Sequence, residues 1–269
     1  MRRLRILFYW LFYCKNNVSF KELVSFIQKP KVNKIAKKFI NEIVLENGFY
    51  EITFKGIKNK LFWPNQFSVK GVNQVTAETF DVNDWHFYQN KNTKIEDGEI
   101  LLDIGTAEGL FPLTVVDKCS HIYMIEPSKI FISSLKKTFQ NFDNKTTIIN
   151  SAVGSIESEV YFNEDSLGGQ ISNNKGNNKI SLSKIDTLFK DKKITYLKAD
   201  IEGFEQEMLI GAAETIKLNK PKIAITCYHK ENDSKEMIKL IKSYVPEYNF
   251  FVKGIHGEEP KPVMIHFWI

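Results

Sequence analysis

The sequence predicts an α/β fold, with a mostly parallel sheet that carries helices on both faces. From residue 96 onward, short apolar runs alternate with amphipathic segments long enough to be the right-handed crossovers that join parallel strands. The chain has 269 residues, of which 43% are hydrophobic and 13% aromatic, so it can bury a large core. We expect a helical cap with a β-hairpin over residues 1–95 and the sheet domain over residues 96–269.

The N-terminal region shows two kinds of pattern. Apolar residues recur at helical spacing over residues 20–27, 34–44 and 67–88, and each segment is predicted to be helical. Residues 49–64 are predicted to form a hairpin that turns near residues 56–59. A polar linker with a turn at Asp97 and Gly98 then precedes the sheet domain.

The first 13 residues place three arginines directly before an apolar, aromatic run. That run is far shorter than the ~20 residues that span a bilayer, and no small-residue cleavage site follows it. We expect a helix docked on the core. The alternative is a weak membrane-surface contact through residues 1–13, because basic and aromatic side chains together suit an interface.

Charge and cysteine content narrow the class of protein. The formal net charge is +5, but the lysines are scattered among acids and asparagines, so no nucleic-acid-binding face is expected. Cys14, Cys119 and Cys227 lie far apart without metal-ligand spacing, which indicates neither a zinc site nor a disulfide framework. A reducing, cytoplasmic location is the expectation.

The sheet domain can be divided into elements in chain order. The predicted strands are residues 100–104, 122–126, 146–153, 194–200, 222–228, 248–254 and 261–269, and the predicted helices are residues 110–118, 129–142, 181–190, 204–218 and 233–244. The last two strands are predicted to form a hairpin on the sheet edge. Residues 163–179 are rich in Asn, Gly and Ser and are predicted to be a mobile loop.

The first predicted strand of this domain ends in a D-x-G-x-x-x-G turn, which is a candidate cofactor site. The expected contacts are Asp103, Gly105, Thr106, Ala107, Glu108 and Gly109. The pattern departs from the G-x-G-x-x-G of dinucleotide sites, and Glu108 would oppose a pyrophosphate at the helix start. Acids there favour a cofactor with positive charge and no phosphate, such as S-adenosylmethionine. A dinucleotide oxidoreductase is the weaker alternative.

The ends of the next two strands supply further candidate cofactor contacts. Glu126 lies 23 residues after Asp103, where an acid can accept hydrogen bonds from ribose hydroxyls, and Pro127 and Ser128 follow it. Ser151 and Ala152 are expected near the adenine. The alternative explanation is that these are ordinary strand-end residues.

A second motif lies at residues 196–205, where an apolar strand ends at Asp200. Glu205 and Glu207 fall in the first turn of the next helix, where carboxylates complement the helix dipole. Asp200 and Glu202 lack that explanation. The strand end should adjoin the glycine turn, so Asp200 is expected to meet both cofactor and substrate.

Together these segments resemble the FkbM-type S-adenosylmethionine-dependent methyltransferases over residues 70–269. The resemblance rests on LLDIGTAEG, the acid in IEP, INSAV, KADIEGFE, the helix that follows it and KPKIAITCYHK. It implies a class I methyltransferase fold, Rossmann-like, with a seven-stranded sheet that ends in an antiparallel hairpin. It also implies methyl transfer to a hydroxyl oxygen of substrates that include sugars and polyketide-type natural products.

Methyl transfer to oxygen requires that a proton be removed. His229, just beyond a strand at the same sheet edge, is the candidate base, and Asp200 is the competing candidate. Asp200, Glu202 and His229 also have the donor types to hold a divalent metal, but no metal is predicted, because sequence gives no ligand geometry. Glu202, His229 and Trp85 are candidate substrate contacts, whereas His86, His256 and His266 are expected to be surface or core histidines.

The sequence therefore predicts an S-adenosylmethionine-dependent O-methyltransferase that acts on a hydroxyl of a carbohydrate or glycoconjugate. The N-terminal cap and residues 163–179 would shape the acceptor site. Two alternatives remain: a methyltransferase acting on a non-sugar natural product, and a scaffold protein that keeps the cofactor fold without catalysis.

Overall fold

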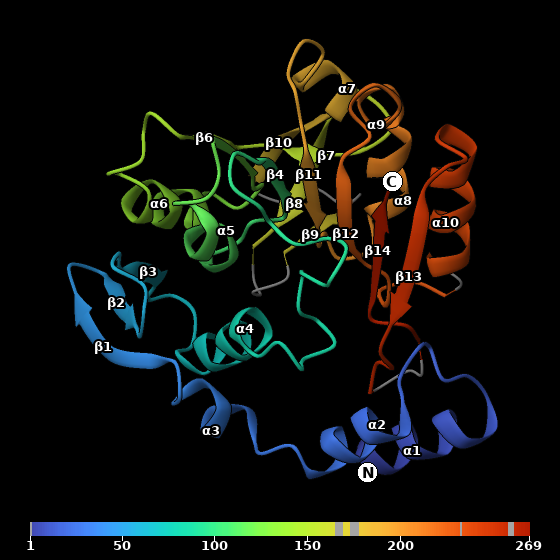
Figure 1. Cartoon of the computed structure of the whole chain (residues 1–269). Coiled ribbons are helices and arrows are strands. Elements are labelled where there is room, and N and C mark those ends of the chain that lie inside the picture. Colours follow the sequence, from blue (N-terminus) through green and yellow to red (C-terminus); the bar gives the residue numbers. More distant parts are fainter. Residues whose placement is uncertain (1, 165–168, 173–177, 232, 258–260) are drawn as a thin grey trace.

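The computed structural model describes residues 2–164, 169–172, 178–231, 233–257 and 261–269. Its main sheet has seven strands in the order β13-β14-β12-β11-β4-β5-β6 (Figure 1). These strands are β4 (Ile100–Ile104), β5 (His121–Ile125), β6 (Thr146–Ile149), β11 (Tyr196–Ala199), β12 (Lys222–Thr226), β13 (Asn249–Lys253) and β14 (Met264–Trp268). Neighbouring strands from β12 to β6 pair in parallel, and β14 pairs antiparallel with β12 and with β13. The predicted α/β sheet with a hairpin at its edge is confirmed.

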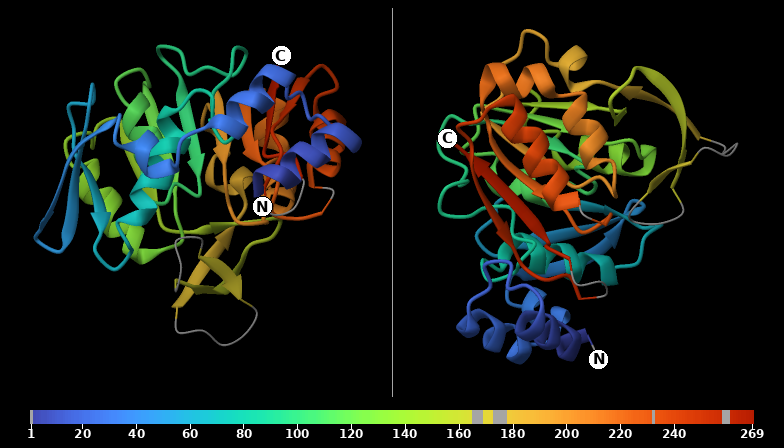
Figure 2. Two further views of the ribbon diagram at one scale, coloured as in Figure 1. Left: turned by 90° about the horizontal axis from the view of Figure 1, so that it is seen from below. Right: turned by 90° about the vertical axis from the view of Figure 1, so that its right-hand side faces the viewer.

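Helices cover both faces of this sheet, as the two views in Figure 2 show. They are α5 (Leu110–Val115), α6 (Lys129–Thr138), α7 (Ile185–Leu188), α8 (Glu205–Ile210), α9 (Ala213–Asn219) and α10 (Asp233–Tyr244). Leu102 and Ile104 of β4 belong to the core cluster on one face, and Leu101 belongs to the cluster on the other. Because successive strand residues point to opposite faces, the continuous apolar runs in the sequence are those of strands buried on both sides.

A second, smaller sheet lies where the sequence predicted a loop and a longer helix. Its order is β7-β10-β8-β9, from β7 (Ala152–Val153), β8 (Ser158–Asn163), β9 (Gln170–Ser172) and β10 (Asn178–Ser183). The predicted helix over residues 181–190 is therefore shortened to α7. The loop prediction for residues 163–179 is wrong at β9 and at the start of β10, and residues 165–168 and 173–177 lie outside the described residues. β9 and β10 are strands because both pair with β8. The composition of a segment does not reveal whether a partner strand lies beside it.

The N-terminal region contains four helices and a three-stranded antiparallel sheet. They are α1 (Arg2–Phe12), α2 (Phe20–Gln28), α3 (Val32–Ala36), β1 (Ile40–Glu46), β2 (Phe49–Phe54), β3 (Leu61–Pro64) and α4 (Lys70–Phe80). The β2–β3 hairpin is confirmed. The helix predicted over residues 34–44 is wrong beyond Ala36, because Asn47 and Gly48 both have positive φ and turn β1 back onto β2.

Helix α1 packs on α2 and on the loop after β13. Ile6 is fully buried in a cluster with Leu23, Trp85 and Ile255, as expected for a docked helix. Its outer face exposes more than half of each of Leu4, Phe8, Leu11 and Phe12. Contact of that face with a membrane surface stays a prediction. Within the described part of the chain, no helix has both the length and the apolar character needed to cross a membrane.

Candidate active site

A cavity of about 490 Å³ lies at the carboxyl ends of β4, β5 and β11, and α4 forms part of its wall. Ten of the residues predicted to contact cofactor or substrate line it: Gly105, Thr106, Ala107, Glu108, Glu126, Pro127, Ser151, Ala152, Asp200 and Glu202. Five others do not line it: Asp103, Gly109, Ser128, His229 and Trp85. The predicted strand ends therefore meet at one edge of the sheet, around a cavity that is partly open to solvent.

The glycine turn forms the floor of this cavity. Gly105 has a φ of +69°, and a Cβ at this position would overlap the carbonyl oxygen of Asp200. The backbone N–H groups of Gly105 and Thr106 donate to the carbonyl of Ile125 at 3.0 and 3.3 Å. A side chain at residue 105 would push the turn away from β11, so only glycine allows the two strand ends to approach this closely.

Glu126 and Glu108 place two buried carboxylates in the cavity wall. Glu126 accepts hydrogen bonds from the backbone N–H groups of Ala107 and Ser128, both at 2.8 Å. Burial raises the pKa of each carboxyl to about 7, and hydrogen bonds from backbone N–H groups partly offset this effect. Near neutral pH, a bound cationic group would therefore favour the ionised form of both residues.

Asp103 lies beneath the glycine turn, where it pairs with a lysine that the sequence analysis did not single out. Lys198 Nζ is 2.9 Å from Asp103 Oδ1 and donates to the Gly105 carbonyl at 2.8 Å. Asp103 is fully buried, while Lys198 lines the cavity. The sequence did contain a signal for this pair, namely a lysine in the middle of an apolar strand. Buried lysines are almost always paired with an acid, so Lys198 could have been predicted to contact one.

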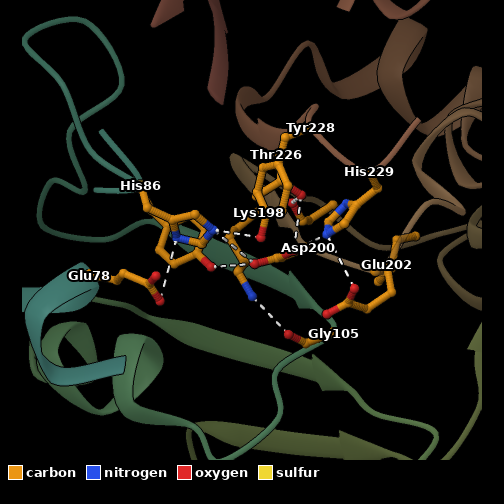
Figure 3. Close-up of polar contacts among 12 residues, drawn as sticks. Glu78, His86, Gly105, Lys198, Asp200, Glu202, Thr226, Tyr228 and His229 are labelled. Atoms are coloured by element: carbon orange, nitrogen blue, oxygen red, sulfur yellow. Dashed lines mark hydrogen bonds and ion pairs between the residues drawn. The ribbon is translucent and has the colours of Figure 1, made fainter. Parts of the chain in front are cut away.

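Asp200 lies at the centre of the polar contacts in the cavity (Figure 3). Its Oδ2 accepts from the Tyr88 hydroxyl at 2.9 Å, and its Oδ1 accepts from the Thr226 hydroxyl at 3.0 Å. Burial acts to raise the pKa of Asp200, but the charges of His86, Lys198 and His229 outweigh that effect and lower it. Asp200 is therefore ionised at neutral pH.

His229 lies on the far side of Asp200, among three carboxylates. Its Nδ1 is 2.9 Å from Glu205 Oε1, and its Nε2 is 3.4 Å from Glu202 Oε2 and 3.7 Å from Asp200 Oδ1. Burial acts to lower the His229 pKa, but the hydrogen bond to Glu205 and the charges of Asp200, Glu205 and Glu202 together raise it to about 9. At neutral pH this imidazole already holds a second proton, which argues against its acting as the base.

Comparison with known proteins identifies the family of this chain. The family model of the methyltransferase FkbM domain matches residues 103–252, from Asp103 into β13. The chain belongs to the FkbM methyltransferase family. No curated protein sequence matches it.

Solved structures of similar fold include a methyltransferase FkbM from Methylobacillus flagellatus KT, at a TM-score of 0.53 and 21% identity. The match covers 75% of this chain and 56% of that one, so this chain spans little more than half of its length. A spermidine synthase from Thermotoga maritima has a TM-score of 0.41 and 11% identity, over 86% of this chain and 72% of that one. A precorrin-6y C5,15-methyltransferase from Geobacter metallireducens GS-15 has a TM-score of 0.40 and 10% identity, over 66% and 84%.

His86 lies inside the cavity of this FkbM family member, although it was expected to be a surface or core histidine. Its Nε2 is 3.4 Å from Asp200 Oδ2 and 3.3 Å from the Tyr228 hydroxyl, and its Nδ1 is 4.0 Å from Glu78 Oε2. The neighbouring Trp85 points away and stacks on Phe26 at 4.3 Å. Residues 85–88 therefore contribute His86 and Tyr88 to the cavity, whereas Trp85, the candidate substrate contact, does not line it.

Glu205 also has more contacts than its position in the first turn of α8 explained. It is fully buried, and its Oε1 accepts from the Ile201 N–H at 3.1 Å and lies beside His229 Nδ1. The sequence analysis explained Glu205 by its favourable interaction with the helix dipole. It therefore did not predict the contact of Glu205 with His229, which lies 24 residues away in the chain. His256 stacks on Tyr228, and His266 is a core residue, as expected.

Proposed function

We propose that this FkbM family member is an S-adenosylmethionine-dependent O-methyltransferase that acts on a hydroxyl of a carbohydrate or glycoconjugate. The observation that carries the choice of cofactor is the charge of the cavity wall. Glu108 lies in the turn where a dinucleotide would bring its pyrophosphate, and of the described lining residues only Lys198 is a lysine or arginine. Because Lys198 is paired with Asp103, the wall favours a cofactor that carries positive charge and no phosphate.

The residues of the cavity can perform the remaining chemistry. S-adenosylmethionine supplies, when bound, a methyl group on a sulfonium that an acceptor oxygen can displace in line. Asp200 is ionised and holds the Nε2 of His86 at 3.4 Å, so this pair is placed to take the proton of an acceptor hydroxyl. Tyr88 and Thr226 fix the orientation of the carboxylate.

The acceptor side of the cavity supports a polyhydroxylated substrate. Glu78, His86, Tyr88, Glu202 and Tyr228 line it and combine carboxylates, an imidazole and phenol groups. Carboxylates accept hydrogen bonds from hydroxyl groups, and phenol groups can both donate and accept them. A non-sugar natural product rich in hydroxyl groups would meet the same chemistry, and the acceptor experiment below separates the two.

The cofactor assignment predicts that Glu126→Ala weakens binding of S-adenosylhomocysteine by about tenfold to a hundredfold, since a hydrogen bond to a charged group contributes about 1.5–3 kcal/mol. Isothermal titration calorimetry measures this affinity. Glu214→Ala is the matched control, because Glu214 is exposed and forms a surface ion pair with Lys217. Unchanged affinity in a folded Glu126→Ala protein would refute the assignment.

The acceptor assignment predicts transfer of labelled methyl groups from S-adenosylmethionine into a glycan or glycolipid fraction. The fractions to compare are cell glycans, lipids and small molecules, each incubated with the wild-type protein and with Asp200→Asn. Label confined to non-sugar small molecules would overturn the carbohydrate assignment. Absence of label from every fraction, with cofactor binding intact, would favour the noncatalytic scaffold.

A further inference from the structure

The outer face of α1 carries a continuous row of large apolar side chains. Leu4, Phe8 and Leu11 are four and then three positions apart, so they share one face of the helix, and the ring centroid of Phe12 lies 4.7 Å from that of Phe8. Each of these four residues exposes more than half of its surface. Ile6, which is about 200° around the helix from Leu4, is instead buried against the rest of the protein.

Hydrogen bonds on the other side of α1 hold the helix in this orientation. Trp10 Nε1 donates to the Val18 carbonyl at 2.7 Å. The Arg3 guanidinium donates to the Ile27 carbonyl at 2.6 Å and also to the Lys29 carbonyl. The apolar row therefore cannot turn inward while these bonds are in place, and it faces solvent in the folded chain.

The exposed apolar surface extends onto α2. Phe20, at the start of that helix, is 66% exposed, and its ring centroid is 6.0 Å from that of Trp10. Both helices lie at one end of the molecule, below the main sheet in Figure 1, and the right-hand view of Figure 2 shows them projecting from the rest of the chain. A flat surface can therefore reach them.

Positive charge accompanies this apolar surface. Residues 1–21 contain five lysines and arginines and no acid, whereas basic and acidic residues are equal in number over residues 22–269. The whole formal net charge of +5 therefore belongs to the segment that contains α1. Arg5, Lys15 and Lys21 are exposed, and none of them forms an ion pair with a residue that the structure describes.

We propose that α1 and the start of α2 bind the surface of a membrane that contains anionic lipids. The 11 residues of α1 extend about 16 Å, which is about half of the ~30 Å hydrocarbon core, so the helix lies in the plane of the interface and does not cross it. Its aromatic and aliphatic side chains enter the boundary between headgroups and acyl chains, and the basic residues attract the anionic headgroups.

A second copy of this chain fits the same surface less well than a membrane does. Self-association through α1 would bring two segments of like charge together without an acid between them, and like charges repel. An acidic protein could meet the charges. However, the apolar row offers a partner only apolar contact, which lipid chains supply without a matching shape. The test below therefore contains lipid and no second protein.

The test is co-sedimentation of the full chain with vesicles of phosphatidylcholine alone, or of phosphatidylcholine mixed with the anionic lipid phosphatidylglycerol. At about 0.1 M salt we expect binding about tenfold stronger, or more, with the anionic vesicles. This difference should disappear at about 1 M salt, where the Debye length falls from about 10 Å to about 3 Å and the charges are screened.

Cys14 allows a second measurement on the chain without any substitution. It is exposed just after α1, whereas Cys119 and Cys227 are buried. An environment-sensitive fluorophore attached to Cys14 therefore reports on the end of α1. We expect its emission to shift to the blue when anionic vesicles are added.

Two variants and two matched controls locate the binding surface. Phe8→Gln should weaken binding to anionic vesicles about tenfold, because an exposed aromatic side chain no longer leaves water. Arg5→Gln should weaken it about fivefold, which corresponds to about 1 kcal/mol for a basic residue near an anionic surface. Leu218→Gln on α9 and Lys190→Gln after α7 should bind as the wild type does. Both controls replace exposed residues, and α7 and α9 lie at the opposite end of the molecule in Figure 1.

The outcomes separate this surface from the proposed function. Absence of wild-type binding to anionic vesicles would overturn the proposal even if a variant fails to fold, and so would equal binding by the folded variants and their controls. A wild-type dimer that dissociates in Phe8→Gln, without vesicle binding, would assign the surface to a second copy. If the vesicles bind but no fraction is methylated, the surface stands and the proposed function fails. Methylation without vesicle binding gives the reverse result.

Discussion

Lys198 shows how a single buried residue supports the glycine turn. Its ammonium group binds both the Asp103 carboxylate and the Gly105 carbonyl, and its side chain lies over the ring of Tyr88 at 4.9 Å. Asp103 was expected to contact the cofactor, but it is fully buried under the turn. Any effect of Asp103 on the cofactor therefore passes through Lys198 and the shape of the turn.

The buried pair predicts a large stability loss when only one partner is removed. Lys198→Met should lower the free energy of unfolding by about 3–5 kcal/mol, because it leaves the Asp103 charge buried without a partner. Urea denaturation measures this loss, and adding Asp103→Asn should recover most of it. Lys60→Met is the control, since the Lys60–Glu51 pair lies at the surface, where solvent screens the charges, and should contribute little to stability. A loss in Lys198→Met no larger than this control would contradict the role of the pair.

At the scale of elements, the contact between the β4–α5 turn and the end of β11 forms the cavity. β4 and β11 are parallel neighbours, and the turn after β4 touches the backbone of Asp200 at Gly105. The glycine spacing was visible in the sequence, and so was the acid at the end of the second strand. Their backbone contact depends on which strands pair, and pairing is a property of the folded sheet.

This contact predicts different outcomes for two glycines that both have positive φ. Gly105→Ala should separate the turn from β11 and reduce S-adenosylhomocysteine affinity at least tenfold. It should also destabilise the fold by more than the free-energy cost of placing alanine at a positive φ. Gly98→Ala should lose only that backbone cost, about 1–2 kcal/mol, because no atom lies within 4 Å of the new Cβ. Calorimetry and urea denaturation compare the variants. Equal stability and affinity in the two would show that the turn can move without consequence.

At the scale of the whole molecule, β14 connects the segment before the sheet to the sheet itself. His266 of β14 is buried, and its Nδ1 lies 2.7 Å from the hydroxyl of Thr93. Burial lowers the His266 pKa to about 3, so the folded protein keeps this imidazole neutral. The unfolded chain takes up a proton there near pH 6.5.

The His266 pKa predicts how stability changes in mild acid. The unfolded state binds the extra proton below pH 6.5 and the folded state does not, so stability falls as the pH drops from 6.5 toward 3. The contribution of this residue is about 1.4 kcal/mol for each pH unit, and it vanishes above pH 6.5. Urea denaturation at pH 7 and pH 5 compares the wild type with His266→Gln. The wild type should lose about 2 kcal/mol more than the variant, and equal losses would show that His266 is protonated in the fold.

Much of the fold could be predicted because its signals are local. Each strand of the main sheet, from Ile100–Ile104 to Met264–Trp268, is a short apolar run, and the helices between them show helical spacing. Strand β1 and three strands of the small sheet, β8, β9 and β10, were missed, because the pairing of Ile43 with Ile52, or of Ile180 with Val160, decides whether such a segment is a strand. Composition does not encode such a partner.

The sequence by itself determined the α/β architecture, the family resemblance and the acids at the strand ends, since these follow from periodicity and from short motifs. Only the tertiary structure decided which side chains meet: His86 with Asp200, Lys198 with Asp103, and Glu205 with His229. His86 and Asp200 are 114 positions apart in the chain. The physical reason is that parallel crossovers bring distant segments to one sheet edge, where burial and charge act on neighbours in space.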